Sequence, residues 1–197
     1  MSKKQLGQFY TTNYEYILSN MTIPTDVNYI IEPFVGNGDL LGFIKDPTKY
    51  IIETYDIDPK YENTIKRDTL SNPPCYTNKF VLTNPPYLSR NKSTHKELYD
   101  KYNCNDLYKC FIVNLIENEC SGGIIIVPLN FVSSIRISDI DLRKRFLKIF
   151  DIIQLNIFEE KVFDDTKYSV SSFQFRLKKE SNILTYRFKR IFILQNI

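Results

Sequence analysis

The chain has 197 residues, of which 43% are hydrophobic and 25% charged, as expected of a globular domain with a buried core. Its net charge of +3 is too small to indicate a nucleic-acid partner by charge alone. No apolar run approaches the length of a membrane span, and the first residues do not resemble a signal peptide. We therefore expect an intracellular protein with no membrane partner.

The cysteines do not have the spacing of a metal site. Cys75, Cys104, Cys110 and Cys120 form no Cys-x-x-Cys pair, and His95 is the only histidine. We expect free thiols in a reducing compartment and no bound metal.

Apolar strand-like segments alternate with helix-like segments, a pattern typical of a mostly parallel sheet covered on both faces. The predicted strands cover residues 29–32, 50–56, 80–83 and 123–127. The predicted helices cover residues 107–119 and 139–149, the second capped by Asp139. Two further strands, 152–158 and 168–177, predict a hairpin that closes the sheet with at least one antiparallel member.

A glycine-containing loop follows the first predicted strand. Gly36 and Gly38 allow the backbone to pass close to a ligand, and Asp56 ends the next strand, where a carboxylate suits a ribose diol. The third glycine of the dinucleotide fingerprint is replaced by Leu41. The pattern therefore favours a nucleoside with a small charged tail over a dinucleotide.

Two polar residues have both a structural and a functional interpretation. Asp68 could accept a hydrogen bond from an adenine amino group, but taken alone it is better explained as a cap or a surface acid. Thr11 lies just before a helix that we expect to begin at Asn13, and capping alone explains a threonine there.

The most informative segment is Asn84-Pro85-Pro86-Tyr87, which follows the apolar strand at 80–83. The Asn84 side-chain oxygen and the Pro85 carbonyl could accept both hydrogens of a conjugated amino group, which would let its nitrogen attack a methyl donor. Tyr87 offers an aromatic face for a flat substrate. The alternative is a Pro-Pro turn that ends the strand.

Basic residues gather just after this segment. They could face phosphates or simply lie on a solvated surface. They are Arg90, Lys92, His95, Lys96 and Lys101.

In their order along the chain, these segments resemble the motifs of the N6-adenine DNA methyltransferases of the gamma motif order, known from restriction–modification systems. The resemblance runs from about Gly7 to Leu177. It implies an α/β fold with a doubly wound, mostly parallel sheet of seven strands. This is the Rossmann-like fold of S-adenosylmethionine-dependent methyltransferases, with an antiparallel strand near one edge.

The resemblance implies S-adenosylmethionine as cofactor, S-adenosylhomocysteine as product, and direct methyl transfer to the N6 amino group of a flipped adenine in DNA. Asn84, Pro85 and Tyr87 would be catalytic, and Tyr87 and Phe163 would stack on the flipped base. The implied cofactor-binding residues are Thr11, Glu32, Phe34, Gly36, Gly38, Asp56, Ile57, Asp68, Thr69 and Pro86. The chain departs from the family at Thr69, where a phenylalanine often lines the adenine pocket.

Residues 1–197 are expected to form a single methyltransferase catalytic domain, with a flexible loop at 88–103. Residues 178–197 are expected to form a short C-terminal extension where family members generally have a target-recognition domain. DNA specificity would then come from the loop, a separate specificity subunit, a second copy of the chain, or a segment that this sequence lacks.

Two alternatives stay open. A protein-glutamine or RNA-adenine methyltransferase could use the same catalytic motif, because an amide nitrogen poses the same conjugation problem. The chain could also be a catalytically impaired partner subunit, although the intact Asn84, Tyr87 and Asp56 argue against that.

Overall fold

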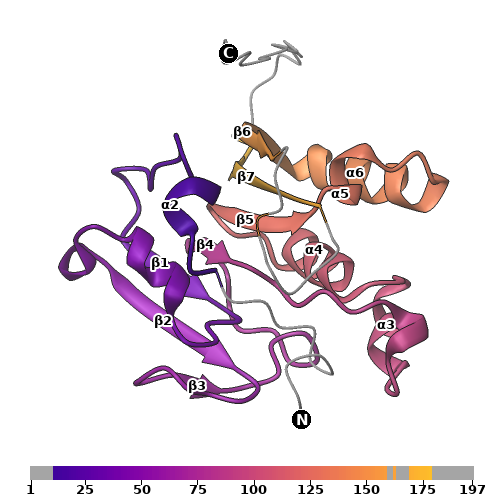
Figure 1. The fold of residues 1–197 in the computed structure, drawn as a ribbon, viewed down its shortest axis with the longest axis horizontal. Coiled ribbons are helices and arrows are strands. Elements are labelled where there is room, and N and C mark those ends of the chain that lie inside the picture. Colours follow the sequence, from indigo (N-terminus) through magenta and orange to yellow (C-terminus); the bar gives the residue numbers. More distant parts are fainter. Residues whose placement is uncertain (1–10, 159–161, 163–168, 179–197) are drawn as a thin grey trace.

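The computed structural model describes residues 11–158, 162 and 169–178. Its strands form one sheet in the order β3-β2-β1-β4-β5-β7-β6 (Figure 1). The bounds are β1 (Tyr29–Glu32), β2 (Ile51–Asp56), β3 (Ile65–Lys66), β4 (Phe80–Thr83), β5 (Gly122–Pro128), β6 (Phe150–Ile157) and β7 (Val170–Leu177). Strands β1 to β5 pair in parallel, and β7 is antiparallel to both of its neighbours. The predicted fold class and the closing hairpin are confirmed.

The helices connect the strands in chain order. The α-helices are α2 (Tyr14–Ile17), α3 (Glu97–Tyr102), α4 (Leu107–Asn118), α5 (Asn130–Ser133) and α6 (Ile137–Ile149). Three short 3-10 helices are η1 (Asp39–Phe43), η2 (Pro47–Lys49) and η3 (Arg90–Lys92). Among the described residues, no helix has the length and apolar character needed to cross a membrane.

Both faces of the sheet are covered. The sequence of β7 alternates between polar and aromatic residues because its side chains point to the two faces in turn. Ser172 and Gln174 face the segment that carries α2, to whose backbone they bond at 2.5 and 2.8 Å. Phe173 and Phe175 point to the opposite face, where they meet rings of α5 and α6. Strand β5 is buried along its whole length, which explains its continuous apolar run.

An aromatic cluster fixes α5 and α6 to the sheet. Its fully or almost fully buried rings have neighbouring centroids 4.9 to 5.9 Å apart. Such pairs stabilise by about 0.5–1.5 kcal/mol beyond the area they bury. The rings belong to Phe131, Phe146, Phe150, Phe173 and Phe175.

The strand order reverses between β1 and β4, which lie side by side in the sheet. From β1 the chain builds outward through β2 and β3, and from β4 it builds outward in the other direction. A crevice forms outside the carboxyl ends of the strands at such a point, and open α/β sheets bind their ligands there. The glycine loop follows β1 and the Asn84 segment follows β4, so the fold brings both to this crevice.

The structure departs from the sequence prediction in three places. The prediction that Asp139 caps its helix is wrong, because α6 begins at Ile137 after Arg136 and the Asp139 carboxylate instead binds Lys109. The segment 88–103 contains η3 and α3. Strand β3 was not predicted, because two residues are too few to show a period.

Candidate functional site

A cavity of about 540 Å³ opens at the carboxyl ends of β1, β2 and β4. Its volume lies in the usual range for small-molecule sites. Most of the predicted site residues line it, namely Thr11, Glu32, Phe34, Gly36, Asp56, Ile57, Asp68, Thr69, Asn84 and Pro86. Gly38, Pro85 and Tyr87 are not part of its lining, and Phe163 lies outside the described residues.

The loop after β1 needs its two glycines for their backbone angles. Gly36 has φ 55° and Gly38 has φ 86°, both in the left-handed region that favours glycine. A Cβ at Gly38 would also lie 2.2 Å from Cδ2 of Tyr61. Larger residues would therefore displace the loop that forms one wall of the cavity.

Asp56 holds the glycine loop and faces the cavity at the same time. Its carboxylate accepts hydrogen bonds from the backbone N–H of Gly36 at 2.9 Å and of Asp58 at 2.8 Å. The residue is only 2% exposed, so the carboxylate has one fixed orientation. Each carboxylate oxygen can accept more than one hydrogen bond, which leaves capacity for the hydroxyls of a ribose.

Asp68 and Thr69 are engaged in local structure. Asp68 accepts from the N–H groups of Leu70 and Ser71, each at 3.1 Å, and so stabilises a turn; no helix follows it before β4, so it is not a helix cap. The buried Thr69 hydroxyl donates to the Pro33 carbonyl at 3.0 Å and fastens the glycine loop. Both residues also line the cavity, and no contact in the structure tests their predicted adenine-binding role.

Glu32 is a buried acid at the end of β1. Its Oε1 accepts from the Thr83 hydroxyl at 2.5 Å and from the Phe34 N–H at 3.1 Å. Burial raises the pKa of Glu32 to about 8; the two hydrogen bonds oppose the rise and the charge of Asp56 adds to it. The side chain is therefore mostly protonated at neutral pH, and a cation placed in the cavity would favour its ionised form.

Glu32 is expected to make stability depend on pH. Its pKa is raised from 4.5 to about 8 in the folded state, so the folded chain keeps a proton that the unfolded chain releases. This stabilising contribution is full below pH 4.5 and is lost as pH rises to about 8. We therefore expect Glu32→Gln to gain unfolding free energy relative to the natural chain between pH 6 and pH 9.

Urea unfolding followed by circular dichroism at several pH values in that range measures this difference. Glu117→Gln, an exposed acid on α4, controls for the loss of one negative charge. A Glu32→Gln difference that stays constant from pH 6 to pH 9 would contradict the expectation.

Asn84 is held from two sides. Its Nδ2 donates to the Thr11 hydroxyl at 3.0 Å, and its Oδ1 accepts from the Tyr87 hydroxyl. The Tyr87 hydroxyl also lies 2.9 Å from the Ile126 carbonyl oxygen. Burial raises the pKa of Tyr87 well above its usual value, with Asp106 and Tyr108 adding to the effect, so the hydroxyl remains a donor.

Tyr87 itself is buried, being only 2% exposed. Its ring meets the Tyr108 ring edge-on, with centroids 6.2 Å apart. In this arrangement Tyr87 presents no face to the cavity, and its hydroxyl occupies the Asn84 oxygen that would accept from a substrate. Stacking on a base would require the ring to turn outward, so that role stays a prediction.

The segment after the motif forms a wall of the cavity that the sequence predicted only in small part. Residues of η3 and α3 and the turns around them contribute to it, and the Tyr99 hydroxyl donates to the Leu88 carbonyl at 2.9 Å. Of these positions, the sequence marked only His95 and Lys101, as members of the basic group, and the others are too irregularly spaced to form a pattern. The wall residues are Leu88, Ser93, His95, Glu97, Leu98, Tyr99 and Lys101.

Arg67 is a second wall residue that the sequence did not single out. Its guanidinium donates to the Asn72 carbonyl at 2.9 Å and lies 5.7 Å from the centre of the Tyr55 ring. Within residues 11–158, 162 and 169–178, no group of three His, Cys, Asp or Glu side chains could hold a metal ion.

Neither protein-family models nor curated proteins match the sequence. Solved structures do match. A candidate class I S-adenosylmethionine-dependent methyltransferase from Listeria monocytogenes superposes with a TM-score of 0.60 at 15% identity, covering 88% of this chain and 59% of that chain. The type IIG restriction endonuclease BpuSI gives a TM-score of 0.53 at 19% identity, covering 85% of this chain and 24% of that chain. DrdV, solved in a complex with DNA, gives a TM-score of 0.61 at 15% identity, covering 88% of this chain and 27% of that chain.

At these identities the likeness shows the fold. The chain has the Rossmann-like α/β fold of the S-adenosylmethionine-dependent methyltransferases. It spans 59% of the length of the Listeria protein and about a quarter of BpuSI and of DrdV.

Proposed function

We propose that the chain transfers a methyl group from S-adenosylmethionine to the N6 amino group of adenine in DNA. The observation that carries the proposal is the Asn84-Pro85-Pro86-Tyr87 segment at the carboxyl end of β4. Its Asn84 and Pro86 line the same cavity as Gly36 and Asp56. Among similarly folded proteins are a type IIG restriction endonuclease and a protein solved in a complex with DNA, which favours DNA over RNA or protein as the acceptor.

The residues of the cavity fit the cofactor. The left-handed Gly36 and Gly38 let the backbone approach a nucleoside, and the fixed Asp56 carboxylate can accept from ribose hydroxyls. Glu32, neutral in the ligand-free chain, would give up its proton when it meets a cationic tail. When bound, S-adenosylmethionine would supply an electrophilic methyl group on a positively charged sulfur.

The other predicted cofactor residues surround the same space. We propose that Thr11 binds the amino-acid tail with Glu32, and that the remaining residues hold the adenine ring. Those residues are Phe34, Ile57, Asp68, Thr69 and Pro86.

Asn84 and Pro85 would bind and activate the amino group that accepts the methyl group. Asn84 Oδ1 and the Pro85 carbonyl would accept the two hydrogens of the adenine amino group, which localises the nitrogen lone pair as the transition state forms. The Tyr87 hydroxyl must first leave Asn84 Oδ1. An outward turn of the Tyr87 ring would both free that oxygen and supply a stacking face, with Phe163 on the other side of the base.

The energies of base flipping and stacking are comparable. Extruding an adenine from the duplex costs a few kcal/mol. Base–aromatic stacking stabilises by about 1–3 kcal/mol per base. Tyr87 and Phe163 could therefore offset most of the cost of flipping.

The domain organisation also remains a proposal. Residues 1–197 would be one catalytic domain, and DNA recognition would come from 88–103, a specificity subunit or a second copy of the chain. The walls that 88–103 contributes to the cavity are compatible with a role next to the reacting base.

Labelled S-adenosylmethionine offered together with duplex DNA, RNA and total protein tests the proposed function. We expect label in DNA, recovered as N6-methyladenine after digestion. Transfer only to RNA or only to protein would replace this proposal by the corresponding alternative. No transfer to any acceptor, with no cofactor binding by calorimetry, would support a catalytically impaired partner subunit.

A further inference from the structure

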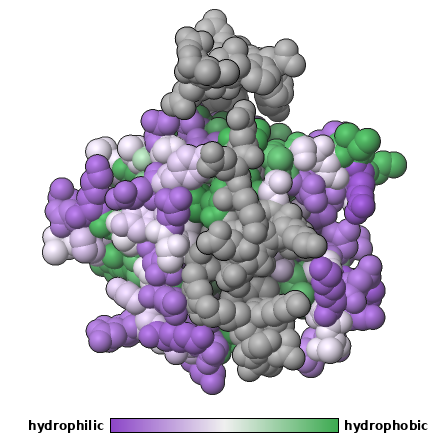
Figure 2. All heavy atoms as spheres, viewed as in Figure 1, coloured by the Kyte–Doolittle hydropathy of each residue, from purple (hydrophilic) through white to green (hydrophobic). Residues whose placement is uncertain are grey.

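The turn between α5 and α6 exposes an arginine between two isoleucines. Ile135 is 88% exposed and Ile137 is 79% exposed, more than any other large hydrophobic residue in the described part of the chain. Apolar spheres protrude at the side of the molecule that carries α6 (Figure 2). Because burial of apolar surface is favourable, a partner that covers these two side chains would gain binding free energy from them.

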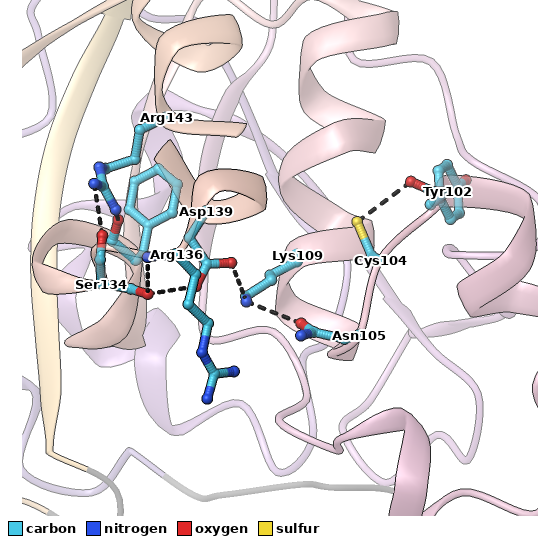
Figure 3. A network of polar contacts seen from close by, with 9 residues as sticks. Tyr102, Cys104, Asn105, Lys109, Ser134, Arg136, Asp139 and Arg143 are labelled. Carbon is cyan, nitrogen blue, oxygen red and sulfur yellow. Dashed lines mark hydrogen bonds and ion pairs between the residues drawn. The ribbon is translucent and has the colours of Figure 1, made fainter. Parts of the chain in front are cut away.

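The turn is rigidly built. The Arg143 guanidinium donates to the Phe131 carbonyl at 3.0 Å and to the Ser134 carbonyl at 2.8 Å. The Ser134 hydroxyl donates to Asp139 at 2.6 Å, and Asp139 in turn pairs with Lys109 at 2.5 Å (Figure 3). The exposed side chains are therefore presented by a fixed backbone, which lowers the entropy cost of binding.

A second cavity of about 450 Å³ lies beside this turn, and its lining includes Ser89, which closely follows the Asn84–Tyr87 segment in the chain. Tyr108 lines it and also meets the Tyr87 ring edge-on. Residues from three parts of the chain share its lining: Ser89, Asn105, Asp106, Tyr108, Ser134 and Arg136.

The floor of this second cavity favours a polar ligand. Asp106 Oδ1 and the Tyr108 hydroxyl are buried, and neither has a hydrogen-bond partner among the described residues. A buried polar atom without a hydrogen-bond partner is destabilising, and an apolar peptide side chain would not supply that partner. The amino groups and ring nitrogens of a DNA base could bond to both.

Charge at the rim favours an anion. Helix α6 and the preceding Arg136 carry five cationic and two acidic side chains, and one of the acids, Asp139, is already paired with Lys109. The Arg136 guanidinium makes no hydrogen bond within the described part of the chain, and Figure 3 shows it pointing away from the surrounding network. Since Asp106 is an acid on the floor, an anion belongs at the rim, near Arg136.

We propose that the α5–α6 turn binds the DNA strand next to the target adenine, with Arg136 on a backbone phosphate and Ile135 and Ile137 against sugars and base edges. Apolar wedges beside a basic side chain are a known way to hold distorted DNA. The choice of DNA as the nucleic acid rests on the proposed function.

Fluorescence anisotropy with the full chain and a fluorescein-labelled DNA duplex, measured over a series of salt concentrations, tests this contact. Arg136→Ala is expected to weaken binding about 5- to 10-fold and to reduce the salt slope by about 1, as for loss of one phosphate contact. The double variant Ile135→Ser/Ile137→Ser is expected to weaken binding by about 10-fold without changing the salt slope, because it removes only apolar contacts.

Two matched controls lie far from the turn. Lys148→Ala removes a cation at the opposite end of α6, about 18 Å away along the helix. Ile153→Ser removes an isoleucine of β6 that is 48% exposed. Both are expected to change DNA affinity by less than about twofold, in line with the small effect of a distant charge at moderate salt.

Unchanged affinity and salt slope in Arg136→Ala, an equal loss in Lys148→Ala, or no binding of the duplex at low salt would overturn the inference. A loss seen with an RNA duplex but not with DNA would overturn the choice of DNA. Methyl transfer is assayed separately. Weaker DNA binding by Arg136→Ala in a chain that transfers no methyl group would contradict the proposed function and leave this inference standing.

Discussion

Replacing Asn84 with alanine is expected to lower methyl transfer by at least about 100-fold, the usual loss when one pre-positioned hydrogen-bonding group at the reacting atoms is removed. In the proposed function Asn84 Oδ1 accepts from the substrate amino group. The variant leaves the local contacts of Glu32 and Asp56 intact and loses, on the cofactor side, only the hydrogen bond from Asn84 Nδ2 to the Thr11 hydroxyl. Cofactor affinity should therefore survive. Single-turnover transfer of label to duplex DNA measures the first quantity, and calorimetry measures the second.

Tyr87→Phe is the companion variant. It keeps the ring but removes the hydroxyl that occupies Asn84 Oδ1, so transfer should stay within about tenfold of the natural chain, less than the loss from removing the acceptor. Loss of a buried hydroxyl near the Ile126 carbonyl should lower stability by about 1–3 kcal/mol. Undiminished transfer in Asn84→Ala would remove Asn84 from the catalytic site.

Replacing Asp139 with alanine is expected to lower the free energy of unfolding by about 3–5 kcal/mol, because it leaves the Lys109 ammonium buried without its counter-charge. The two side chains are 6% and 9% exposed, with Nζ and Oδ1 2.5 Å apart. Asn105 accepts a second hydrogen bond from Lys109 at 2.9 Å. Burial would raise the pKa of Asp139, but hydrogen bonds from Lys109 and Ser134 outweigh it and lower the pKa.

A double variant distinguishes the cost of leaving one charge unpaired from the cost of removing the whole ion pair. Lys109→Met/Asp139→Leu should recover most of the loss, because apolar residues of similar size replace both charges. The exposed pair Arg90–Asp100, at 2.8 Å, is the matched control, and Asp100→Ala should cost less than about 1 kcal/mol. Urea unfolding measures all three. An equal, small loss of unfolding free energy in Asp139→Ala and Asp100→Ala would show that the buried pair stabilises the fold no more than the exposed pair does.

The same pair explains why the helix-cap prediction failed. A cap is worth about 1 kcal/mol, and sequence rules assign it from neighbouring residues. Compensating a buried ammonium is worth about 3–5 kcal/mol, so the carboxylate goes to Lys109 when the fold places Lys109 nearby. Lys109 lies thirty positions away in the chain, on another helix, and no local pattern connects the two residues.

Local sequence was sufficient to predict the strands other than β3 in their order along the chain, the glycine loop and the segment after β4. Apolar runs bounded by proline and glycine mark buried strands, and parallel strands deliver their carboxyl ends to one edge of the sheet. Glu32, Gly36, Asp56 and Asn84 follow or end such strands, so their common cavity follows from the topology.

Tertiary structure alone decided the burial of Tyr87, the raised pKa of Glu32, the wall contributed by residues 88–101 and the second cavity. Each depends on contacts between residues distant in sequence, and desolvation arises only when those residues enclose one another. The sequence by itself determined the order of the elements and the chemistry of the residues at their ends. Packing decided which of those residues line the cavity and which, like Tyr87, are buried away from it.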